Sequence, residues 1–280
     1  MLSDHELKLK SVRYRRKLLT LIKAAGAGHT GGDLSCIDIL NVLYNRVLNV
    51  SPETFDSPER DRYIQSKGHC AEALYVVLAD RGFFPEEELD TLARYRSRLT
   101  GHPTRKVPGV EHNTGALGHG LAVAVGMAIA GKMGNCPYGV FALLGDGELD
   151  EGSSWEASLL AAHYRLDNLV VIVDRNTLQI TGCTEEVLAL EPLADKLTAF
   201  GFSVRSVDGH DIAELTDAFS AAPFEPGKPS LILARTMKGR GVSFIENVAG
   251  WHHRVPSDEE YEAAMRELDE AEARLGAGSS

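Results

Sequence analysis

The chain has 280 residues, 44% of them hydrophobic, and carries a formal net charge of −11 at pH 7. This length and apolar content provide for a large buried core and argue against a disordered chain. The acidic balance argues against nucleic acid or a membrane surface as a partner, but it is compatible with a local basic patch for a small anionic ligand.

The first third of the chain predicts three helices and a short strand. Residues 11–25 have the apolar spacing of a helix, and a glycine-rich segment ends it. Residues 30–45 predict a second helix, with Asp33 as its candidate N-cap. A short strand and a tight turn are expected at 60–69, followed by a third helix at 70–82.

Strands and helices then alternate. Residues 83–113 are irregular and basic, and 120–134 are apolar nearly all round, which predicts a buried helix. Further strands are expected at 138–144, 167–174, 202–208 and 229–236. Continuous apolar strands separated by helices predict the α/β class, with a parallel sheet flanked by helices on both faces.

The C-terminal segment differs in composition. Residues 257–275 are charged and heptad-like, which predicts a solvated or packing helix, and 276–280 are expected to be an unstructured tail. We therefore divide the chain into one large domain, 1–257, and a C-terminal helix and tail, 258–280.

The cysteines and the hydropathy pattern bear on the compartment. The four cysteines, Cys36, Cys70, Cys136 and Cys183, have no C-x-x-C spacing and predict neither a disulfide framework nor a zinc site. The N-terminus has no apolar signal core, and no stretch approaches the roughly 20 apolar residues of a membrane span. We expect a cytoplasmic protein that does not associate with membranes.

The segment "GDGELDEG" at 145–152 directly follows a predicted strand. In a parallel sheet, ligands bind beyond the carboxyl ends of the strands, where glycine exposes N–H groups to an anion and a carboxylate can hold a hard cation. Asn176 follows the next strand and adds a second oxygen ligand beside Asp146. This pair suits Mg²⁺ bound together with a phosphorylated ligand, and Ca²⁺ or Mn²⁺ would also be accommodated.

The same residues carry a family resemblance. "GDG" followed about thirty residues later by "DRN" resembles the thiamine diphosphate fingerprint, and "GDGELDEGSSWEA" resembles its form in transketolases. The similarity continues through "AGAGHTGGDLS", "SKGHCAEALY", "GHPTRKVPGVEHNTGALGHGL", "DGHD", "KPSLILARTMKGRG" and "WHHRVP". It covers nearly the whole chain, but only the N-terminal, diphosphate-binding part of a transketolase. The implied fold is the thiamine diphosphate-binding fold.

The resemblance implies a metal site and a diphosphate site at the strand ends. Asp146, Asn176 and the backbone carbonyl of Leu178 correspond to metal ligands, and Asn176 also lies at the cofactor. The backbone N–H of Gly147 and the side chain of His69 correspond to groups that contact the diphosphate.

The rings of the cofactor have corresponding residues as well. Gly115 and Leu117 match a segment that lines the aminopyrimidine, and Ile180 matches an apolar residue that packs on the thiazolium.

The catalytic residues implied by the resemblance are three histidines and two glutamates. His253 corresponds to a residue that contacts the diphosphate and faces the reacting centre. His29 and His102 correspond to substrate-side residues that bind donor oxygens or carry protons. Glu151 and Glu156 match acids of a proton relay near the dimer interface.

Three positions depart from the family pattern. Thr30 replaces a usual proline, and His119 replaces a glutamine found in many relatives, so the role of His119 stays open. "WHHRVP" contains two adjacent histidines. We choose His253 because it keeps the spacing to the proline, with His252 as the rival.

Several polar residues are expected to have no site role. Glu148 and Asp150 are interpreted as solvent-facing neighbours of the important acids, and His210 as a surface or core histidine.

The implied reaction is transfer of a two-carbon ketol unit from a ketose phosphate donor to an aldose phosphate acceptor. Transketolases activate thiamine diphosphate with a glutamate of the pyrimidine-binding domain. We expect that domain on a separate C-terminal subunit, in an α2β2 assembly, without which this chain is inactive. The alternatives are the alpha subunit of a 2-oxo acid dehydrogenase and a non-catalytic cofactor-binding module, neither of which explains four histidines.

Overall fold

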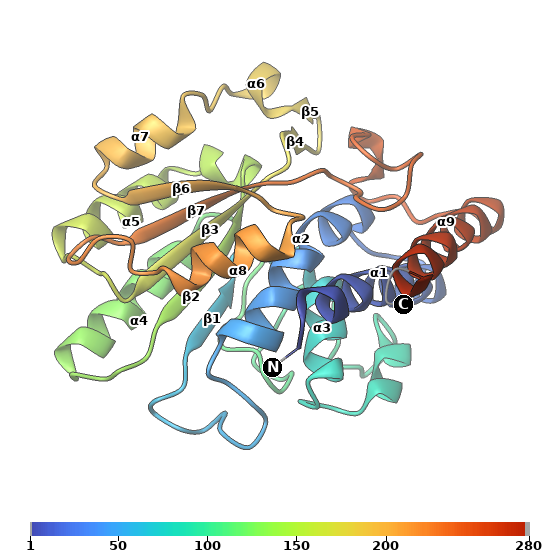
Figure 1. The fold of residues 1–280 in the computed structure, drawn as a ribbon, viewed down its shortest axis with the longest axis horizontal. Helices are drawn as coiled ribbons and strands as arrows, with labels where there is room; N and C mark the ends of the chain where they lie inside the picture. The colour runs from blue at the N-terminus through green and yellow to red at the C-terminus, as the bar shows by residue number, and fades with distance from the viewer. Residues whose placement is uncertain (1, 278–280) are drawn as a thin grey trace.

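A computed structural model describes residues 2–277. Its centre is a parallel five-stranded sheet with the order β1-β2-β3-β7-β6, which runs from β1 at the bottom to β6 at the top of Figure 1. The strands are β1 (Arg62–Gln65), β2 (Val140–Gly145), β3 (Leu169–Arg175), β7 (Ser230–Arg235) and β6 (Ser203–Asp208). The predicted parallel α/β sheet and its five strands are confirmed.

Alternate residues of the inner strands face opposite cores. In β2, Phe141 and Leu143 belong to one buried cluster, whereas Ala142 and Leu144 belong to the other. Successive side chains of a strand point to opposite faces, so a strand covered on both sides must be apolar throughout. This is the reason that these strands read as continuous hydrophobic runs.

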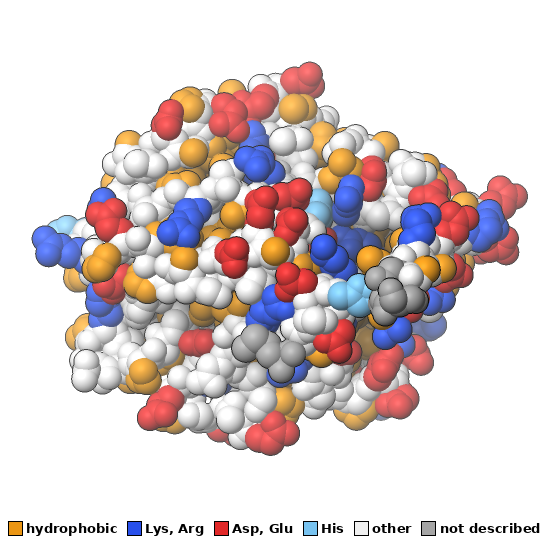
Figure 2. Space-filling model, in the orientation of Figure 1, with side chains coloured by type: hydrophobic (Ala, Val, Ile, Leu, Met, Phe, Trp, Pro, Cys, Tyr) orange, Lys and Arg blue, Asp and Glu red, His pale blue; other side chains and the backbone are white. Residues whose placement is uncertain are grey.

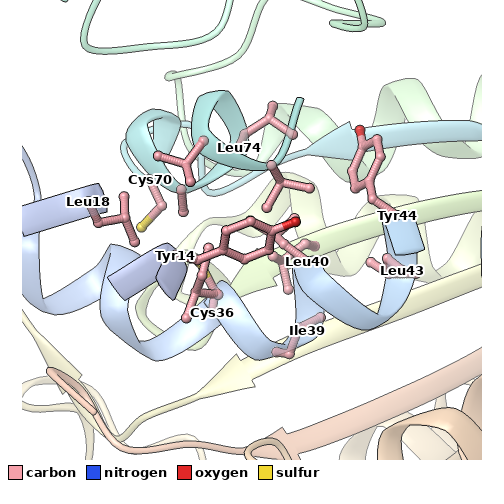
Figure 3. Close-up of a cluster of buried hydrophobic side chains, with 14 of the residues drawn as sticks. Tyr14, Leu18, Cys36, Ile39, Leu40, Leu43, Tyr44, Cys70 and Leu74 are labelled. Atoms are coloured by element: carbon pink, nitrogen blue, oxygen red, sulfur yellow. The ribbon is translucent and has the colours of Figure 1, made fainter. Parts of the chain in front are cut away.

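Helices cover both faces of the sheet. One face carries α1 (Asp4–Ala25), α2 (Thr30–Val42), α3 (Ala71–Asp80) and α8 (Ile212–Ser220), and α2 continues into a π-helical turn (Leu43–Val47). Figure 3 shows side chains of this core, including Leu18, Leu40 and Leu74, meeting between the helices. The other face carries α4 (His119–Met133), α5 (Gly152–His163) and α7 (Leu193–Ala199).

Short elements connect this framework. A two-stranded antiparallel hairpin, β4 (Leu178–Gln179) with β5 (Gly182–Cys183), follows β3 and leads into α6 (Thr184–Val187). Single 3-10 turns occupy η2 (Glu86–Thr91), η3 (Gly147–Asp150) and η4 (Ala249–Trp251). The predicted irregular segment 83–113 therefore contains one 3-10 turn.

Two local predictions are wrong. The helix at 119–133 is buried on one face only, because Met133 is 84% exposed while Leu121 and Val125 face the core. Asp33 does not cap the second helix, which begins at Thr30. Its carboxylate instead accepts the N–H of Ala73, in the first turn of α3, at 3.0 Å. Asp33 of α2 thus caps the N-terminus of α3, a neighbouring helix. The sequence around Asp33 does not reveal this contact, because Ala73 is 40 residues further along the chain.

The C-terminal helix α9 (Asp258–Ala277) lies along α1 at the right of Figure 1. Leu268 and Ala264 are buried against the main core, and Glu272 forms ion pairs with Arg13 and Arg16 at 2.8 Å. The helix also includes residues 276 and 277, so the predicted tail is wrong there, and 278–280 lie outside the described residues. The division at residue 257 stays a prediction.

None of the helices described for residues 2–277 is both long and apolar enough to cross a membrane.

The packing of α9 predicts unequal effects of two substitutions. Leu268→Ala removes buried methyl groups and is expected to lower the free energy of unfolding by about 2–4 kcal/mol. Glu272→Gln weakens partly solvated ion pairs and should cost less than about 1 kcal/mol. Urea unfolding measures both. Equal, small effects would mean that α9 is a loosely attached arm.

Candidate active site

A pocket of about 530 Å³ lies beyond the carboxyl ends of β2 and β3. All of the predicted site residues except Glu151 and Glu156 line it. They are His29, His69, His102, Gly115, Leu117, Asp146, Gly147, Asn176, Leu178, Ile180 and His253. The segments that supply them are far apart in the chain, and the parallel sheet brings them together because its strand ends share one edge.

The oxygen donors follow two adjacent strands. Asp146 is the first residue after β2, and its N–H bonds to the carbonyl of Asp174 in β3 at 3.3 Å. Its carboxylate accepts the N–H groups of Thr177 at 2.6 Å and Gly147 at 2.9 Å. The Asn176 side-chain oxygen accepts the N–H of Leu178 at 3.1 Å. These backbone contacts fix the carboxylate and the amide relative to each other.

The donor set fits a hard divalent cation. One carboxylate, one amide oxygen and one backbone carbonyl are the ligand types that Mg²⁺ uses alongside phosphate and water. The Leu178 carbonyl already accepts a cationic group, the Lys238 ammonium, at 3.0 Å. Burial and the neighbouring Asp174 raise the pKa of Asp146, a cost that a bound cation would relieve.

An ion pair underlies this edge of the sheet. Asp174, at 0% exposure, pairs with the buried Lys67 ammonium and accepts the Ser35 hydroxyl at 2.6 Å. Burial disfavours both charges, but the pairing outweighs it, since the pKa of Asp174 is lowered and that of Lys67 is raised. Asn176 donates to the same carboxylate at 3.3 Å, so the pair also orients a candidate metal ligand.

Lys238 enters the pocket from the loop after β7. Its ammonium, in a side chain only 2% exposed, contacts the Leu178 carbonyl and Nδ1 of His252 at 2.9 Å. Burial and then the charge of Lys67 lower its pKa to about 8. Within residues 2–277 it has no carboxylate partner, so a bound anion would satisfy it.

Five histidines cluster in the same pocket. The centre of the His29 ring lies 4.4 Å from the ring centre of His253, 5.3 Å from that of His69, 5.5 Å from that of His252 and 6.1 Å from that of His102. One ring nitrogen each of His29, His252 and His253 lies within 4.8 Å of the others. The Nδ1 of His29 is buried without a protein partner and is free for a ligand.

The protonation of the cluster follows from its burial. Desolvation, with the neighbouring His253, lowers the pKa of His29 to about 4, and desolvation with Lys238 lowers that of His252 to about 3. Burial also lowers the pKa of His69 and of His102. These four imidazoles are neutral at pH 7, so each can donate one hydrogen bond and accept another.

Two glycines permit the close packing of these rings. A Cβ on Gly115, whose φ is +137°, would lie 2.7 Å from the ring of His102. A Cβ on Gly32 would lie 2.7 Å from the sulfur of Cys70, next to His69. A larger residue at Gly115 would displace the His102 ring, and one at Gly32 would displace the Cys70 sulfur beside His69.

Comparison with known proteins agrees with this arrangement. The family model "Transketolase, thiamine diphosphate binding domain" matches residues 8–271. The chain belongs to the transketolase family. It is 48% identical to one of the subunits of the apulose-4-phosphate transketolase of Phocaeicola vulgatus, over 96% of each chain. It is 44% identical to the 6-deoxy-6-sulfo-D-fructose transketolase subunit SqwG of a Clostridium species, over 91% of this chain and 93% of that one.

Solved transketolase structures agree with the fold. The transketolase of Campylobacter jejuni is 30% identical and superposes with a TM-score of 0.89, over 98% of this chain and 46% of that one. The predicted family and its thiamine diphosphate-binding fold are confirmed, and membership in the transketolase family favours this assignment over the 2-oxo acid dehydrogenase.

The transketolase resemblance missed part of the pocket. Lys67, Lys238 and Gln179 line it, as does His252, which remains a rival to the more exposed His253. Both lysines lie inside motifs that carry the family resemblance, "SKGH" and "MKGRG". Their position in these motifs is the one sequence feature that indicates a place in the pocket. A lysine in a sequence is usually a solvated residue, so their burial could not be read from the pattern.

The interpretation of Glu148 as solvent-facing is wrong. This pocket residue is 2% exposed, and its carboxylate accepts the N–H of Gly118 at 2.9 Å, the N–H of Gly145 at 3.1 Å and the hydroxyl of Ser66. It joins the start of α4 to the end of β2, because the 3-10 turn after Asp146 rotates this side chain inward. Asp150 is half-buried.

Glu151 and Glu156 are exposed and lie outside the pocket. His119 is also exposed, with Nδ1 3.2 Å from the Leu117 carbonyl. The suggested interface role of the two glutamates stays a prediction.

A buried acid pair lies behind the histidines. Asp33 and Glu72, exposed by 0% and 2%, interact through their carboxyl groups, and one oxygen of each accepts no N–H or O–H from the rest of the described chain. Burial raises the pKa of both carboxyls, that of Glu72 to about 7. The pair therefore holds at least one proton near neutral pH.

This pair predicts a pH-dependent stability. In the unfolded chain carboxyls titrate near pH 4, so its contribution is complete below that pH and is lost as the pH rises through about 7. Asp33→Asn replaces the shared proton with an amide. Relative to the wild type, we expect its free energy of unfolding to rise between pH 5 and pH 8 by roughly 1 kcal/mol or more.

Urea unfolding across this pH range measures the difference, with the exposed Asp90→Asn as the matched control. A constant difference between Asp33→Asn and the wild type would show that the two carboxyls do not share a proton.

Proposed function

We propose that this chain is the diphosphate- and metal-binding subunit of a two-chain, thiamine diphosphate-dependent transketolase. It transfers a two-carbon ketol unit from a ketose phosphate to an aldose phosphate. The observation that carries the proposal is one pocket that combines oxygen donors suited to a cation with neutral histidines. The similarity to transketolase subunits over nearly their whole length supports it.

The cation and the diphosphate bind at the strand ends. Asp146, Asn176 and the Leu178 carbonyl hold Mg²⁺, or Ca²⁺ or Mn²⁺ in its place. The backbone N–H of Gly147 and the side chain of His69 bind the diphosphate. Both groups line the pocket that contains the oxygen donors, which supports this assignment.

Lys238 and His253 complete the diphosphate site. Lys238 is a buried cation without a carboxylate partner, and its interaction with an anion is strong because water is largely excluded. On anion binding its amine becomes fully protonated, since a nearby negative charge favours the ammonium.

The cofactor rings extend toward the open side of the pocket. Gly115 and Leu117 line the aminopyrimidine, and Ile180 packs on the thiazolium. Thiamine diphosphate supplies a nucleophilic carbon and an electron sink for cleavage of the bond beside a ketose carbonyl. Ile180 is 62% exposed in the chain by itself, which is consistent with a face that another domain covers.

The histidines handle the sugar hydroxyls. His29, His102 and His253 bind donor oxygens and exchange protons with them. Neutral imidazoles suit this task, because a ring nitrogen that accepts a hydroxyl proton can later return it. The buried Nδ1 of His29 has no hydrogen-bond partner among residues 2–277, which supports a contact of this imidazole with a bound ligand.

A separate subunit completes the site. It supplies the pyrimidine-binding domain and its activating glutamate, in a cytoplasmic α2β2 assembly of carbohydrate metabolism. Glu151 and Glu156 are exposed and follow the pocket residue Glu148 closely in the sequence. We assign them to a proton relay at the interface with the second subunit. The two subunit relatives are named for different sugars, so the donor is to be determined by assay.

The first prediction concerns the assembled enzyme. Purified from its own source with its partner chain, and given Mg²⁺ and thiamine diphosphate, the protein should transfer ketol units from a ketose phosphate, while the chain alone shows no activity. The donors to compare are apulose 4-phosphate, 6-deoxy-6-sulfofructose, xylulose 5-phosphate and fructose 6-phosphate. Decarboxylation of pyruvate without ketol transfer would contradict the proposal, and cofactor binding without turnover of any donor would favour the non-catalytic module.

A second prediction concerns the cation. Asp146→Asn keeps the shape and an acceptor for the Thr177 N–H but removes the charge that binds Mg²⁺. We expect the Kd for thiamine diphosphate at fixed Mg²⁺ to rise by about 100-fold, together with a loss of thermal stability, because the Gly147 N–H loses its acceptor and Arg175 loses a charged partner at 3.1 Å.

Calorimetric titration of the assembled enzyme measures this, with the exposed Asp217→Asn as control. An unchanged Kd would remove Asp146 from the proposed cation site.

A further inference from the structure

The loop that carries Lys238 is held from behind by a buried network. Lys238 faces the pocket, whereas its neighbours are anchored on the opposite side. The N–H of Met237 donates to Nε2 of His210 at 2.8 Å, and the carbonyl of Arg240 accepts Nε of Arg15 at 2.8 Å. The backbone is thus fixed on both sides of the lysine.

His210 and Arg15 meet at one carboxylate. Arg15 and Asp38, exposed by 5% and 3%, form a two-pronged pair with distances of 3.0 and 2.6 Å. Nδ1 of His210 donates to the same Asp38 at 2.7 Å. Since Nε2 accepts the Met237 N–H, these partners select the neutral tautomer with its proton on Nδ1.

The network reaches the loop from the side away from the pocket. It lies at the floor of a separate hollow between α1, α8 and α9, where Figure 2 shows Lys and Arg side chains gathered beside a histidine. Its members come from α1, α2 and the turn after β6, and none lines the pocket. Its direct contacts with the Lys238 loop are those of His210 and Arg15, while Asp38 and the Leu34 carbonyl, which Arg15 contacts at 3.3 Å, connect it to α2.

We propose that His210 is a positioning residue, which with Arg15 and Asp38 sets the reach of Lys238 into the pocket. The inference rests on the proposed function, in which Lys238 binds the diphosphate. It extends that function to residues outside the pocket.

The physical reason is the flexibility of a lysine. Its long side chain binds an anion well only if its backbone is held, because ordering the chain costs conformational entropy. Here the stem packs closely: a Cβ on Gly31 would lie 3.0 Å from Cγ of Lys238. A shift of the loop by a fraction of an ångström would change the contacts of Nζ with Leu178 and His252.

Two substitutions distinguish the role of the His210 ring shape from that of its hydrogen-bond acceptor, Nε2. His210→Phe keeps the ring shape but removes the acceptor of the Met237 N–H. His210→Gln keeps an acceptor near the Nε2 position. In the assembled enzyme with Mg²⁺, we expect His210→Phe to raise the Kd for thiamine diphosphate about tenfold, because the Met237 N–H loses its acceptor and Asp38 loses the Nδ1 donor. His210→Gln should stay within about threefold of the wild type.

The decisive measurement is a double-mutant cycle with Lys238→Met. Because His210 acts through the lysine, His210→Phe should change the Kd by less than about twofold in the Lys238→Met background. At saturating cofactor, kcat of His210→Phe should stay within about twofold of the wild type. Hydrogen exchange should show faster exchange of the Met237 amide in His210→Phe and not in the exposed control His163→Phe.

Two outcomes would overturn the inference: an equal rise in Kd with and without Lys238, or unchanged Kd in His210→Phe despite a freed Met237 amide. If His210→Phe does not fold, His210→Asn, which keeps the donor to Asp38 and loses the acceptor, takes its place with the same expectations. Failure of the wild-type enzyme to bind thiamine diphosphate would refute the proposed function, and the Met237 exchange would still report the anchoring.

Discussion

The buried ion pair between Lys67 and Asp174 is the interaction on which this edge of the sheet depends. Asp174, the next-to-last residue of the central strand β3, contacts Ser35 of α2, Lys67 of the turn after β1, Thr236 beyond β7 and Asn176. Removing one partner of such a pair leaves an uncompensated buried charge, a cost of about 3–5 kcal/mol. The pair therefore joins four segments and places the amide of Asn176 beside Asp146.

An acidic protein can bind an anionic ligand because the field inside a pocket is local. The net charge of −11 belongs to the whole chain, and Figure 2 shows acidic side chains spread over the visible surface. In the pocket, Lys67 is neutralised by Asp174, and the buried histidines are uncharged. Lys238 is then the cation left to attract a phosphate, with any bound metal. Its position, rather than the overall charge, decides how well the anion is held.

Two rigid supports meet at the loop after β7. On the pocket side, Thr236 bonds to Asp174, and on the far side Met237 and Arg240 bond to His210 and Arg15. Lys238 lies between these anchors. Buried charged groups beneath the site thus hold it in place. Its mouth is open to solvent in this chain, where Ile180 is 62% exposed. A rigid floor and an open mouth suit a pocket that another domain completes.

Much of the fold and of the pocket follows from local sequence. Continuous apolar runs identify the inner strands β2, β3 and β7 because each is covered on both faces. Strand-end residues such as Asp146 and Asn176 identify the binding edge because parallel strands end together. The transketolase resemblance added His29, His69, His102 and His253, which indeed converge.

What only the tertiary structure decided is which polar side chains are buried and with whom they pair. Glu148, Lys67 and Lys238 belong to residue types that usually lie on the surface, and Asp33 belongs to a type that usually caps its own helix, yet all four are buried. Burial of a charge depends on a partner far away in the chain, such as Asp174 for Lys67, 107 residues on. Periodicity records which face of a strand or helix is apolar, but it contains no information about these long-range pairs.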